Sequence, residues 1–353
     1  MKLLELAMSE LKGELLQGDM GVELGALVYD SRKISPGCLF VCMKGANFDS
    51  HELLPALPGK GVAAVVIDRE VETLPEGLTV YRADNARASL AALSAAYFGF
   101  PARELLTIGV TGTKGKTTTT HMIRALLEAG GIPTGLIGTN GITVGKEHIA
   151  TKNTTPESYE IQESFRKMAD AGCKAVVMEV SSQGLMLHRT GSILFDYGVF
   201  MNIAPDHIGP NEHKSFEEYL FWKSQLFLQC KTGLINADDV HSLYIEKMAT
   251  CEKLYRFGEK NPADFTLRNL SHTADPDFVG MRFDFAGAGR DIADVKVGMP
   301  GRFNAENALA ALSVAALAGV KDEVLRTGLK NIRVNGRMEI VKLHPYTVLV
   351  DYA

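Results

Sequence analysis

The feature that most constrains this chain is the segment LLTIGVTGTKGKTTTT at residues 105–120, a short apolar run that leads through a glycine-containing turn into consecutive threonines. It predicts a buried strand, a tight turn and a helix from about Thr117 to Ala129, ending at two glycines. In this arrangement the backbone N–H groups of the turn and the helix N-terminus bind polyphosphate oxygens, a lysine neutralises charge, and the next hydroxyl binds Mg²⁺. Lys116 and Thr117 occupy those positions, although Val110 stands where the strict pattern has its first glycine.

A glycine- and threonine-rich turn without a ligand is the alternative interpretation of this segment. Four consecutive threonines, residues 117–120, are poor helix formers and have little other reason to open a helix. We therefore favour a phosphate-binding loop.

Strands and helices are expected to alternate on both sides of this loop. Before it, apolar runs of strand length alternate with helical stretches; they lie at residues 38–43, 62–67 and 78–81, and the last helix is at 86–98. After it, further apolar runs end in polar residues; they lie at 174–180, 197–202 and 233–236, and an apolar helix follows at 305–317. The pattern predicts an α/β fold with a doubly wound, mostly parallel sheet.

This alternation predicts that the chain is divided into three parts. We expect a small N-terminal α/β domain at residues 1–100, the parallel-sheet domain at 101–336, and the start of a further, C-terminal domain at 337–353, where the chain stops next to a strand. Ligands gather at the carboxyl ends of parallel strands, which directs attention to the polar residues at 111–118, 179–182 and 202–207.

Composition and charge narrow the class of protein. The formal net charge of −5 gives no basic excess for binding a nucleic-acid backbone. Residues 1–16 mix charged with apolar residues, which predicts an amphipathic helix and not a signal peptide, and the longest nearly apolar run, 308–320, is too short to cross a bilayer. Five cysteines without zinc or disulfide spacing are expected to be reduced thiols. We expect a cytoplasmic protein without membrane or nucleic-acid partners.

The loop sequence TGTKGKTT resembles the TGTNGKTT signature of the Mur ligases and of the related folylpolyglutamate and cyanophycin synthetases, with Lys114 where asparagine is usual. The resemblance extends along nearly the whole chain and is closest to the MurE type, which adds the third residue of the peptidoglycan stem peptide. It implies an ATP-binding loop whose members are Gly112, Thr113, Lys114, Gly115, Lys116, Thr117 and Thr118.

A carboxylate at a strand end is the usual second ligand for the Mg²⁺ that phosphoryl transfer needs, and Glu179 has that position. A structural carboxylate paired with a core arginine is the alternative. The segment EVSSQGLMLHR resembles EVSSHGL…HR of the family, which implies that Glu179 holds Mg²⁺ and that Ser181 and Arg189 contact a UDP-muramyl-dipeptide. Gln183 and Leu187 depart from the family pattern.

A second metal position is implied by two further segments. Asp206-His207 follows an apolar strand and resembles the D-H of N-x-x-x-D-H-L-D, whose histidine binds Mg²⁺; a structural histidine is the alternative. Lys223, in YLFWKSQLF, resembles the lysine of Y-x-x-x-K-x-x-L-F, which CO₂ converts into a metal-binding carbamate. Its alternative is a lysine that reaches along the surface to solvent.

The remaining contacts rest on the resemblance alone. A uridine-binding domain with a DSR…G-x-LF pattern implies substrate contacts at Ser31, Ala46, Asn47 and Phe48. An N-T-T-P loop implies substrate contacts at Asn153, Thr154 and Thr155. ATP contacts are implied at Asn307, Arg337 and Asp351; Asn304 in the same segment has the alternative role of capping the helix.

The resemblance implies an ATP- and Mg²⁺-dependent ligase. ATP phosphorylates the D-Glu carboxylate of UDP-N-acetylmuramoyl-L-Ala-D-Glu, and the amine of a free amino acid then displaces phosphate from the acyl-phosphate. Diaminopimelate is favoured over L-lysine as that amino acid, and a monomer is expected. A folylpolyglutamate- or cyanophycin-type ligase and a non-catalytic nucleotide-binding regulator remain as alternatives.

Overall fold

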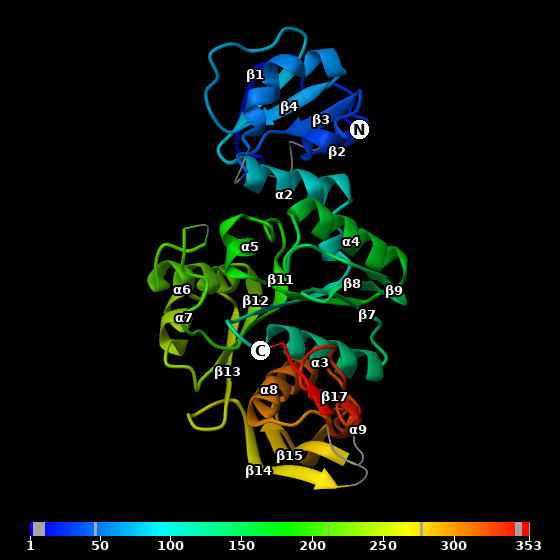
Figure 1. Ribbon diagram of the computed structural model, residues 1–353, viewed down its shortest axis with the longest axis vertical. Helices are drawn as coiled ribbons and strands as arrows, with labels where there is room; N and C mark the ends of the chain where they lie inside the picture. Colours follow the sequence, from blue (N-terminus) through cyan, green and yellow to red (C-terminus); the bar gives the residue numbers. More distant parts are fainter. Residues whose placement is uncertain (3–10, 46–47, 211, 276–277, 343–347, 353) are drawn as a thin grey trace. The chain divides into compact units, whose positions relative to one another are not determined.

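The computed structural model describes residues 1–2, 11–45, 48–210, 212–275, 278–342 and 348–352 (Figure 1). These residues form two compact units, which are described separately. The first unit comprises Met1–Arg103 with two later segments, Glu157–Arg166 and Met186–Ser192; the second comprises Glu104–Pro156, Lys167–Leu185 and Ile193–Ala353. The domain boundaries proposed from the sequence at residues 100 and 336 stay a prediction.

The first unit is built on a five-stranded sheet in the order β1-β5-β4-β3-β2. Its strands are β1 (Gly13–Gln17), β2 (Ala26–Val28), β3 (Cys38–Val41), β4 (Ala64–Ile67) and β5 (Thr79–Ala83); β2 to β5 are parallel and β1 is antiparallel to β5. Its helices are the short 3-10 turns η1 (Ser31–Lys33), η2 (Ser50–Ala56), η3 (Pro58–Lys60) and η4 (Pro101–Arg103), together with α2 (Ala86–Tyr97). Alternate strand residues point to opposite faces: Val66 packs with Leu90 of α2, and Val65 packs on the η2 side with Leu54.

The helix predicted at residues 1–16 is wrong where the structure describes it, because Gly13–Gln17 is strand β1. Residues 3–10 of that prediction lie outside the described residues. Glu14 pairs in register with Arg82 of β5, and their side chains form an ion pair. Pairing with a neighbouring strand therefore prevails over the local helical pattern.

The second unit contains an eleven-stranded sheet in the order β16-β15-β14-β13-β12-β11-β6-β10-β7-β8-β9. Its strands before residue 240 are β6 (Leu106–Thr111), β7 (Thr134–Gly138), β8 (Gly141–Val144), β9 (Glu147–Ile149), β10 (Ala175–Glu179), β11 (Phe195–Phe200) and β12 (Cys230–Asn236). Those after it are β13 (Lys253–Gly258), β14 (Phe265–Asp275), β15 (Phe278–Gly287) and β16 (Arg290–Val297). The central strands are parallel, and antiparallel strands extend the sheet at both edges.

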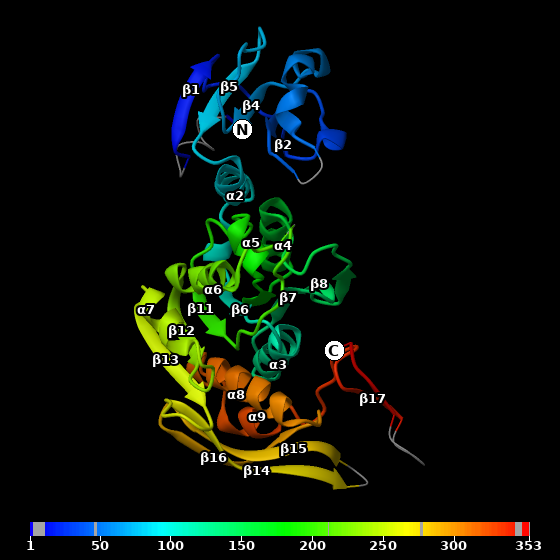
Figure 2. The same ribbon diagram turned by 60° about the vertical axis from the view of Figure 1, so that its left-hand side comes forward.

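Helices cover both faces of the parallel strands (Figure 2). The helices are α3 (Lys116–Ala129), α4 (Ser158–Asp170, mostly in the first unit), α5 (Ser182–Met186), α6 (Phe216–Ser224), η5 (Gln225–Leu228), α7 (Ser242–Met248), α8 (Arg302–Leu317) and α9 (Asp322–Thr327). Ile108 and Val110 of β6 share a core with α3 and α8. Gly109 between them faces the other way, where an added Cβ would lie 3.1 Å from Leu226 of η5. A separate pair, β17 (Glu339–Lys342) and β18 (Val348–Val350), is antiparallel.

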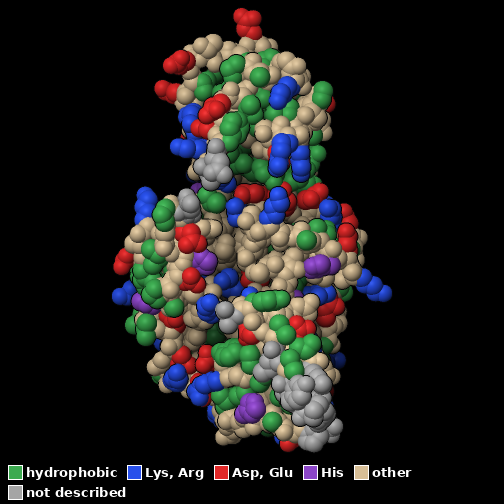
Figure 3. Space-filling model, in the orientation of Figure 1, with side chains coloured by type: hydrophobic (Ala, Val, Ile, Leu, Met, Phe, Trp, Pro, Cys, Tyr) green, Lys and Arg blue, Asp and Glu red, His purple; other side chains and the backbone are tan. Residues whose placement is uncertain are grey.

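The predicted α/β class with a doubly wound, mostly parallel sheet is confirmed, while the antiparallel strands at its edges were not predicted. Among the described residues, no helix has the length and apolar character that crossing a membrane requires. All five cysteines are described and are free thiols. On the face drawn in Figure 3, acidic and basic side chains are interspersed.

Candidate functional site

The predicted phosphate loop lies between β6 and α3, at the carboxyl end of the central strand. Its backbone is held by Asn202, which follows the neighbouring strand β11. The Lys114 N–H donates to Asn202 Oδ1 at 2.9 Å, and Asn202 Nδ2 donates to the Lys114 carbonyl at 3.1 Å. The Thr113 N–H donates to the Asn202 carbonyl at 2.9 Å. The loop conformation is therefore fixed by the adjacent strand end as well as by its own glycines.

Gly115 caps α3 with a φ of 86°, a left-handed conformation that side chains disfavour. A Cβ here would lie 2.4 Å from Asn307 Oδ1 on α8. We expect Gly115→Ala to lower the free energy of unfolding by about 1–2 kcal/mol and to weaken ADP binding, because Asn307 must move. Urea unfolding and calorimetric titration with ADP measure the two effects.

Gly131→Ala is the matched control for that prediction. Gly131 has a similar φ of 82°, but an added Cβ would meet nothing within 4 Å. It should therefore lose comparable stability and keep its ADP affinity. Equal ADP affinity in both variants would contradict the role of the Gly115–Asn307 contact.

Glu179 ends β10 with its side chain buried at 1% exposure. Thr117 Oγ1 donates to Glu179 Oε2 at 3.0 Å, and the Thr139 N–H donates to Oε1 at 2.8 Å. The Thr139 hydroxyl also donates to Oε2, at 3.3 Å. None of these partners carries a charge, so the alternative of a carboxylate paired with a core arginine does not describe Glu179. The predicted pair of Thr117 and Glu179 is in direct contact.

Two lysines converge on one carbonyl of the loop. Lys116 Nζ and Lys223 Nζ each donate to the Gly112 carbonyl at 2.8 Å, and Lys116 also donates to the Thr113 carbonyl at 3.2 Å. Lys223 is 1% exposed and its Nζ lies 4.4 Å from the ring centre of Tyr219, so it does not reach to solvent. Burial lowers the pKa of the Lys116 ammonium, and burial together with the charge of Lys116 lowers the pKa of Lys223 well below its ordinary value.

His207 follows β11 in a left-handed backbone conformation, with φ 54°, and its side chain is 47% exposed. Glu212 Oε1 lies 2.9 Å from His207 Nδ1, and Asp206 Oδ2 lies 4.0 Å from His207 Nε2. A carboxylate that holds one ring nitrogen orients the other, an arrangement common beside metal ions. The geometry permits a ligand role for His207 at Nε2.

A cavity of 600 Å³ brings most of the predicted nucleotide and metal residues together. Predicted residues that line it are those at 113–118 with Thr154, Glu179, His207, Asn307, Arg337 and Asp351. Lys223 is not among the lining residues. Arg337 Nη1 donates to the Tyr352 carbonyl at 2.6 Å, and the Met338 N–H donates to Asp351 Oδ2 at 3.3 Å, so the last described residues are tied to the segment that carries Arg337.

The predicted substrate residues are divided between the two units. Thr155 is buried; its hydroxyl donates to the Glu179 carbonyl at 2.9 Å and accepts from the Ser181 N–H at 3.0 Å. Asn153, two residues earlier in the chain, is exposed. Ser31, Phe48 and Arg189 belong to the first unit, whereas Ala46 and Asn47 lie outside the described residues.

Sequence reasoning missed two residues of the site. Thr139 bonds Glu179 as described above, and the Tyr219 hydroxyl lies 3.0 Å from Thr113 Oγ1 while its ring contacts Lys223. The sequence signal that could have identified Thr139 is its position directly after the apolar run at 134–138.

The prediction that Asn304 caps the helix is wrong. Helix α8 begins at Arg302, and Asn304 Nδ2 donates back to the Pro300 carbonyl at 2.7 Å.

Oxygen atoms that can bind a hard cation such as Mg²⁺ lie together in one part of the site. Among the described residues, no group of three or more His, Cys, Asp or Glu side chains is arranged to hold a metal. Thr117 and Glu179 nevertheless place a hydroxyl and a buried carboxylate side by side at the cavity, and Mg²⁺ is commonly held by one or two protein oxygens with phosphate and water completing its shell. The residues present therefore fit Mg²⁺ bound together with a nucleotide.

The doubly wound sheet, the loop at its carboxyl edge and the adjoining cavity define an α/β protein of the phosphate-loop class. The family models agree at a finer level: the Mur ligase middle domain matches residues 110–315, and the Mur ligase family catalytic domain matches residues 23–98. The chain belongs to the Mur ligase family.

Individual relatives and solved structures are consistent with this. The chain is 36% identical to the UDP-N-acetylmuramoyl-L-alanyl-D-glutamate–2,6-diaminopimelate ligase of Bacillus velezensis, over 100% of this chain and 72% of that protein. It is 35% identical to the corresponding ligase of Clostridium perfringens, over 98% of this chain and 72% of that protein. A solved structure of a ligase of that name has a TM-score of 0.85 at 23% identity, covering 100% of this chain and 71% of its own. Mycobacterium tuberculosis folylpolyglutamate synthase has a TM-score of 0.60 at 19% identity over 76% of this chain. The two structures support the fold.

Proposed function

We propose that this chain acts in the cytoplasm as an ATP- and Mg²⁺-dependent ligase that joins an amino acid to UDP-N-acetylmuramoyl-L-Ala-D-Glu. Diaminopimelate is the favoured amino acid and L-lysine is the other candidate. The observation that carries the proposal is the cavity in which the phosphate loop meets the buried carboxylate of Glu179. Relatives named as diaminopimelate ligases, matched over nearly the whole chain, support the choice of substrates.

The protein's contribution to such a reaction is positioning and charge neutralisation. Loop N–H groups at 115–117 and Lys116 Nζ would bind the β- and γ-phosphate oxygens of ATP, which requires Lys116 to exchange its carbonyl partners for phosphate. Thr117 and Glu179 would hold one Mg²⁺, and His207 with a carbamylated Lys223 would hold a second; Mg²⁺ neutralises charge on the transferring phosphoryl group. Asn307, Arg337 and Asp351 are proposed as further ATP contacts.

The covalent steps involve only the substrates. An oxygen of the D-Glu carboxylate attacks the γ-phosphorus and ADP leaves, which gives an acyl-phosphate. The neutral amine of the incoming amino acid attacks the acyl carbon, phosphate leaves, and the amine loses a proton as the amide forms. Ser31, Phe48, Asn153, Thr154, Thr155, Ser181 and Arg189, together with Ala46 and Asn47, are proposed to bind the UDP-muramyl-dipeptide, and the protein is proposed to act as a monomer.

Product analysis tests the proposal. The purified protein is incubated with ATP, Mg²⁺ and UDP-N-acetylmuramoyl-L-Ala-D-Glu, with diaminopimelate, L-lysine or no amino acid. We expect a UDP-linked tripeptide and one ADP per amide, with more product from diaminopimelate. A folate–glutamate mixture in place of the UDP substrate is the control for a folylpolyglutamate-type ligase.

Each other outcome of the product analysis has its own interpretation. Product from the folate–glutamate mixture alone would replace the proposed substrate. ATP binding without turnover on any mixture would favour a nucleotide-binding regulator. Calorimetric titration with UDP-N-acetylmuramoyl-L-Ala-D-Glu shows independently whether that substrate binds.

A further inference from the structure

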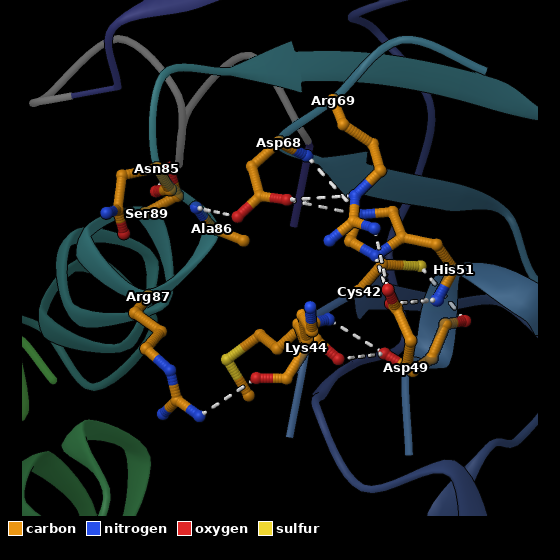
Figure 4. Close-up of polar contacts among 12 residues, drawn as sticks. Cys42, Lys44, Asp49, His51, Asp68, Arg69, Asn85, Ala86, Arg87 and Ser89 are labelled. Atoms are coloured by element: carbon orange, nitrogen blue, oxygen red, sulfur yellow. Dashed lines mark hydrogen bonds and ion pairs between the residues drawn. The ribbon is translucent and has the colours of Figure 1, made fainter. Parts of the chain in front are cut away.

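His51 of the first unit is a buried histidine whose ring lies between two carboxylates, and none of the proposed catalytic steps uses it (Figure 4). His51 Nδ1 lies 2.7 Å from Asp49 Oδ1, and Nδ1 donates this hydrogen bond because a carboxylate oxygen can only accept. Nε2 accepts from the Asp68 N–H at 3.4 Å and lies 3.3 Å from Asp68 Oδ1. Burial and two polar partners fix the ring in one orientation.

Asp49 lies in one of two paired segments, residues 43–45 and 48–50, which are called the stems. An antiparallel bridge joins Lys44 to Asp49, and the Gly45 N–H donates to the Phe48 carbonyl at 2.9 Å. Below the bridge, the Met43 N–H donates to Ser50 Oγ at 2.7 Å, and this hydroxyl donates to the Met43 carbonyl at 3.0 Å. The two stems are therefore joined, and the Phe48 side chain on the second stem is 47% exposed.

Asp68, Arg69 and Arg87 tie these stems to the sheet and to α2. Asp68 follows β4, and its Oδ2 accepts from the Ala86 N–H in the first turn of α2 at 3.2 Å. Arg69 Nη1 pairs with Asp49 Oδ2 at 2.6 Å. Figure 4 shows Arg87 of the same helix directed toward the Lys44 carbonyl, to which its Nη2 donates at 3.5 Å. Arg69 Nε also lies 3.8 Å from Asp68 Oδ1, so His51 and Arg69 both join the Asp49 stem to Asp68 and so to the start of α2; His51 is the buried one of the two.

We infer that His51 is a positioning residue, which holds the stem at Phe48 and Asp49 in the conformation that receives the uridine end of the substrate. The inference rests on the proposed function, because Phe48 is a substrate contact only there. An exposed phenyl group is a suitable platform for the uracil ring, but it contributes affinity only if its backbone is held before the ligand arrives. His51 supplies that restraint through Asp49 without touching the substrate.

The test uses the full chain and measures the pairing of the stems and the binding of the ligand separately. His51→Ala is expected to speed hydrogen exchange of the Gly45 amide by at least about 10-fold. It should also weaken binding of UDP-N-acetylmuramoyl-L-Ala-D-Glu by about 10-fold, the scale of one hydrogen bond to a charged group. ADP affinity, set in the second unit, should not change. His51→Asn keeps a donor for Asp49 and should restore most of the substrate affinity.

Gln17→Ala is the matched control for a purely structural effect. Gln17 Nε2 donates to the Pro75 and Leu78 carbonyls at 2.7 and 2.8 Å. This variant therefore also loses two side-chain hydrogen bonds of the first unit, and neither of them involves the stems. It should lower the melting temperature and leave UDP-substrate affinity unchanged. Unchanged Gly45 exchange in a folded His51→Ala variant overturns the inference, as does faster exchange in that variant with unchanged substrate affinity. If the wild type binds no UDP substrate, the proposed function is overturned instead. Hydrogen exchange of the Gly45 amide then still decides whether His51 restrains the stems.

Discussion

Lys116→Ala should lower ATP-dependent product formation by at least about 100-fold, the scale of removing one group that stabilises transition-state charge. In the structure the Lys116 ammonium is held by the Gly112 and Thr113 carbonyls within the loop itself. Without this ammonium, the phosphates would face the Gly112 and Thr113 carbonyls, whose oxygens cannot neutralise phosphate charge. Initial rates of amide formation, together with calorimetric titration of a non-hydrolysable ATP analogue, measure the loss.

The fold should survive this change, because the hydrogen bonds of the Lys116 side chain go to two carbonyls of its own loop. Thermal unfolding of Lys116→Ala should stay close to that of the wild type. Lys146→Ala, which removes an exposed lysine from the turn between β8 and β9, is the control and should keep wild-type rates. Near-normal turnover by a folded Lys116→Ala variant would show that nucleotide chemistry takes place elsewhere.

The parallel core of the fold was predictable because each of its strands carries a strong local signal. β6 and β10 are short and almost wholly buried, β11 is buried over its last three residues, and polar residues lie just beyond each strand. Their carboxyl ends meet at one edge of a parallel sheet, so the proximity of the phosphate loop and Glu179 also followed from the pattern. Chemistry placed at strand ends is the part of this site that sequence reasoning locates best.

The antiparallel edges escaped prediction for a different reason. β15 alternates between buried and half-buried residues over Met281–Ala286, and a period-2 pattern of this kind is a weaker local signal than a continuous apolar run. β14 is buried only at its start and is exposed or half-buried after Leu267. β1 carries a helical pattern but is held by β5, through partners such as Arg82 that lie far along the chain. Non-local pairing of this kind is not encoded in any local window.

The side chains that hold the catalytic candidates also escaped prediction, because their roles depend on contacts between distant segments. Thr139 reaches Glu179 across the β7–β10 pair, and Tyr219 reaches Thr113 from α6. Neither residue type in its own segment indicates a ligand site. The convergence of Lys116 and Lys223 on the Gly112 carbonyl belongs to the same class of contact, and it has a chemical consequence.

Lys223→Ala should lower amide formation by about 100-fold or more, while UDP-substrate affinity stays within about twofold. A buried ammonium beside a second ammonium is unfavourable, and both effects lower the pKa of Lys223. Lowering this pKa enlarges the fraction of neutral amine at neutral pH. The neutral amine can attack CO₂, forming an N–C bond and releasing one proton, so that an anionic carbamate able to bind a cation replaces a cation that repels one.

The direction of the pH dependence follows from that step. Carbamate is favoured while the amine is neutral and is lost as the pH falls through the lowered pKa, so wild-type activity should decline on the acidic side and recover when CO₂ is added. Removing CO₂ from the buffers should lower activity at constant pH. A ¹³C resonance from ¹³CO₂ that is absent in Lys223→Ala reports the carbamate directly, without turnover.

Chemical rescue separates the carbamate from a packing role. Acetate should partly restore activity to Lys223→Ala, because the truncated side chain leaves space for a carboxylate beside Tyr219. Lys223→Met preserves much of the side-chain volume without the amine; it should be as inactive as the alanine variant and should not respond to acetate. Full activity in Lys223→Met, or a wild type indifferent to CO₂ with no ¹³C signal, would leave Lys223 as a buried lysine that only hydrogen-bonds the Gly112 carbonyl.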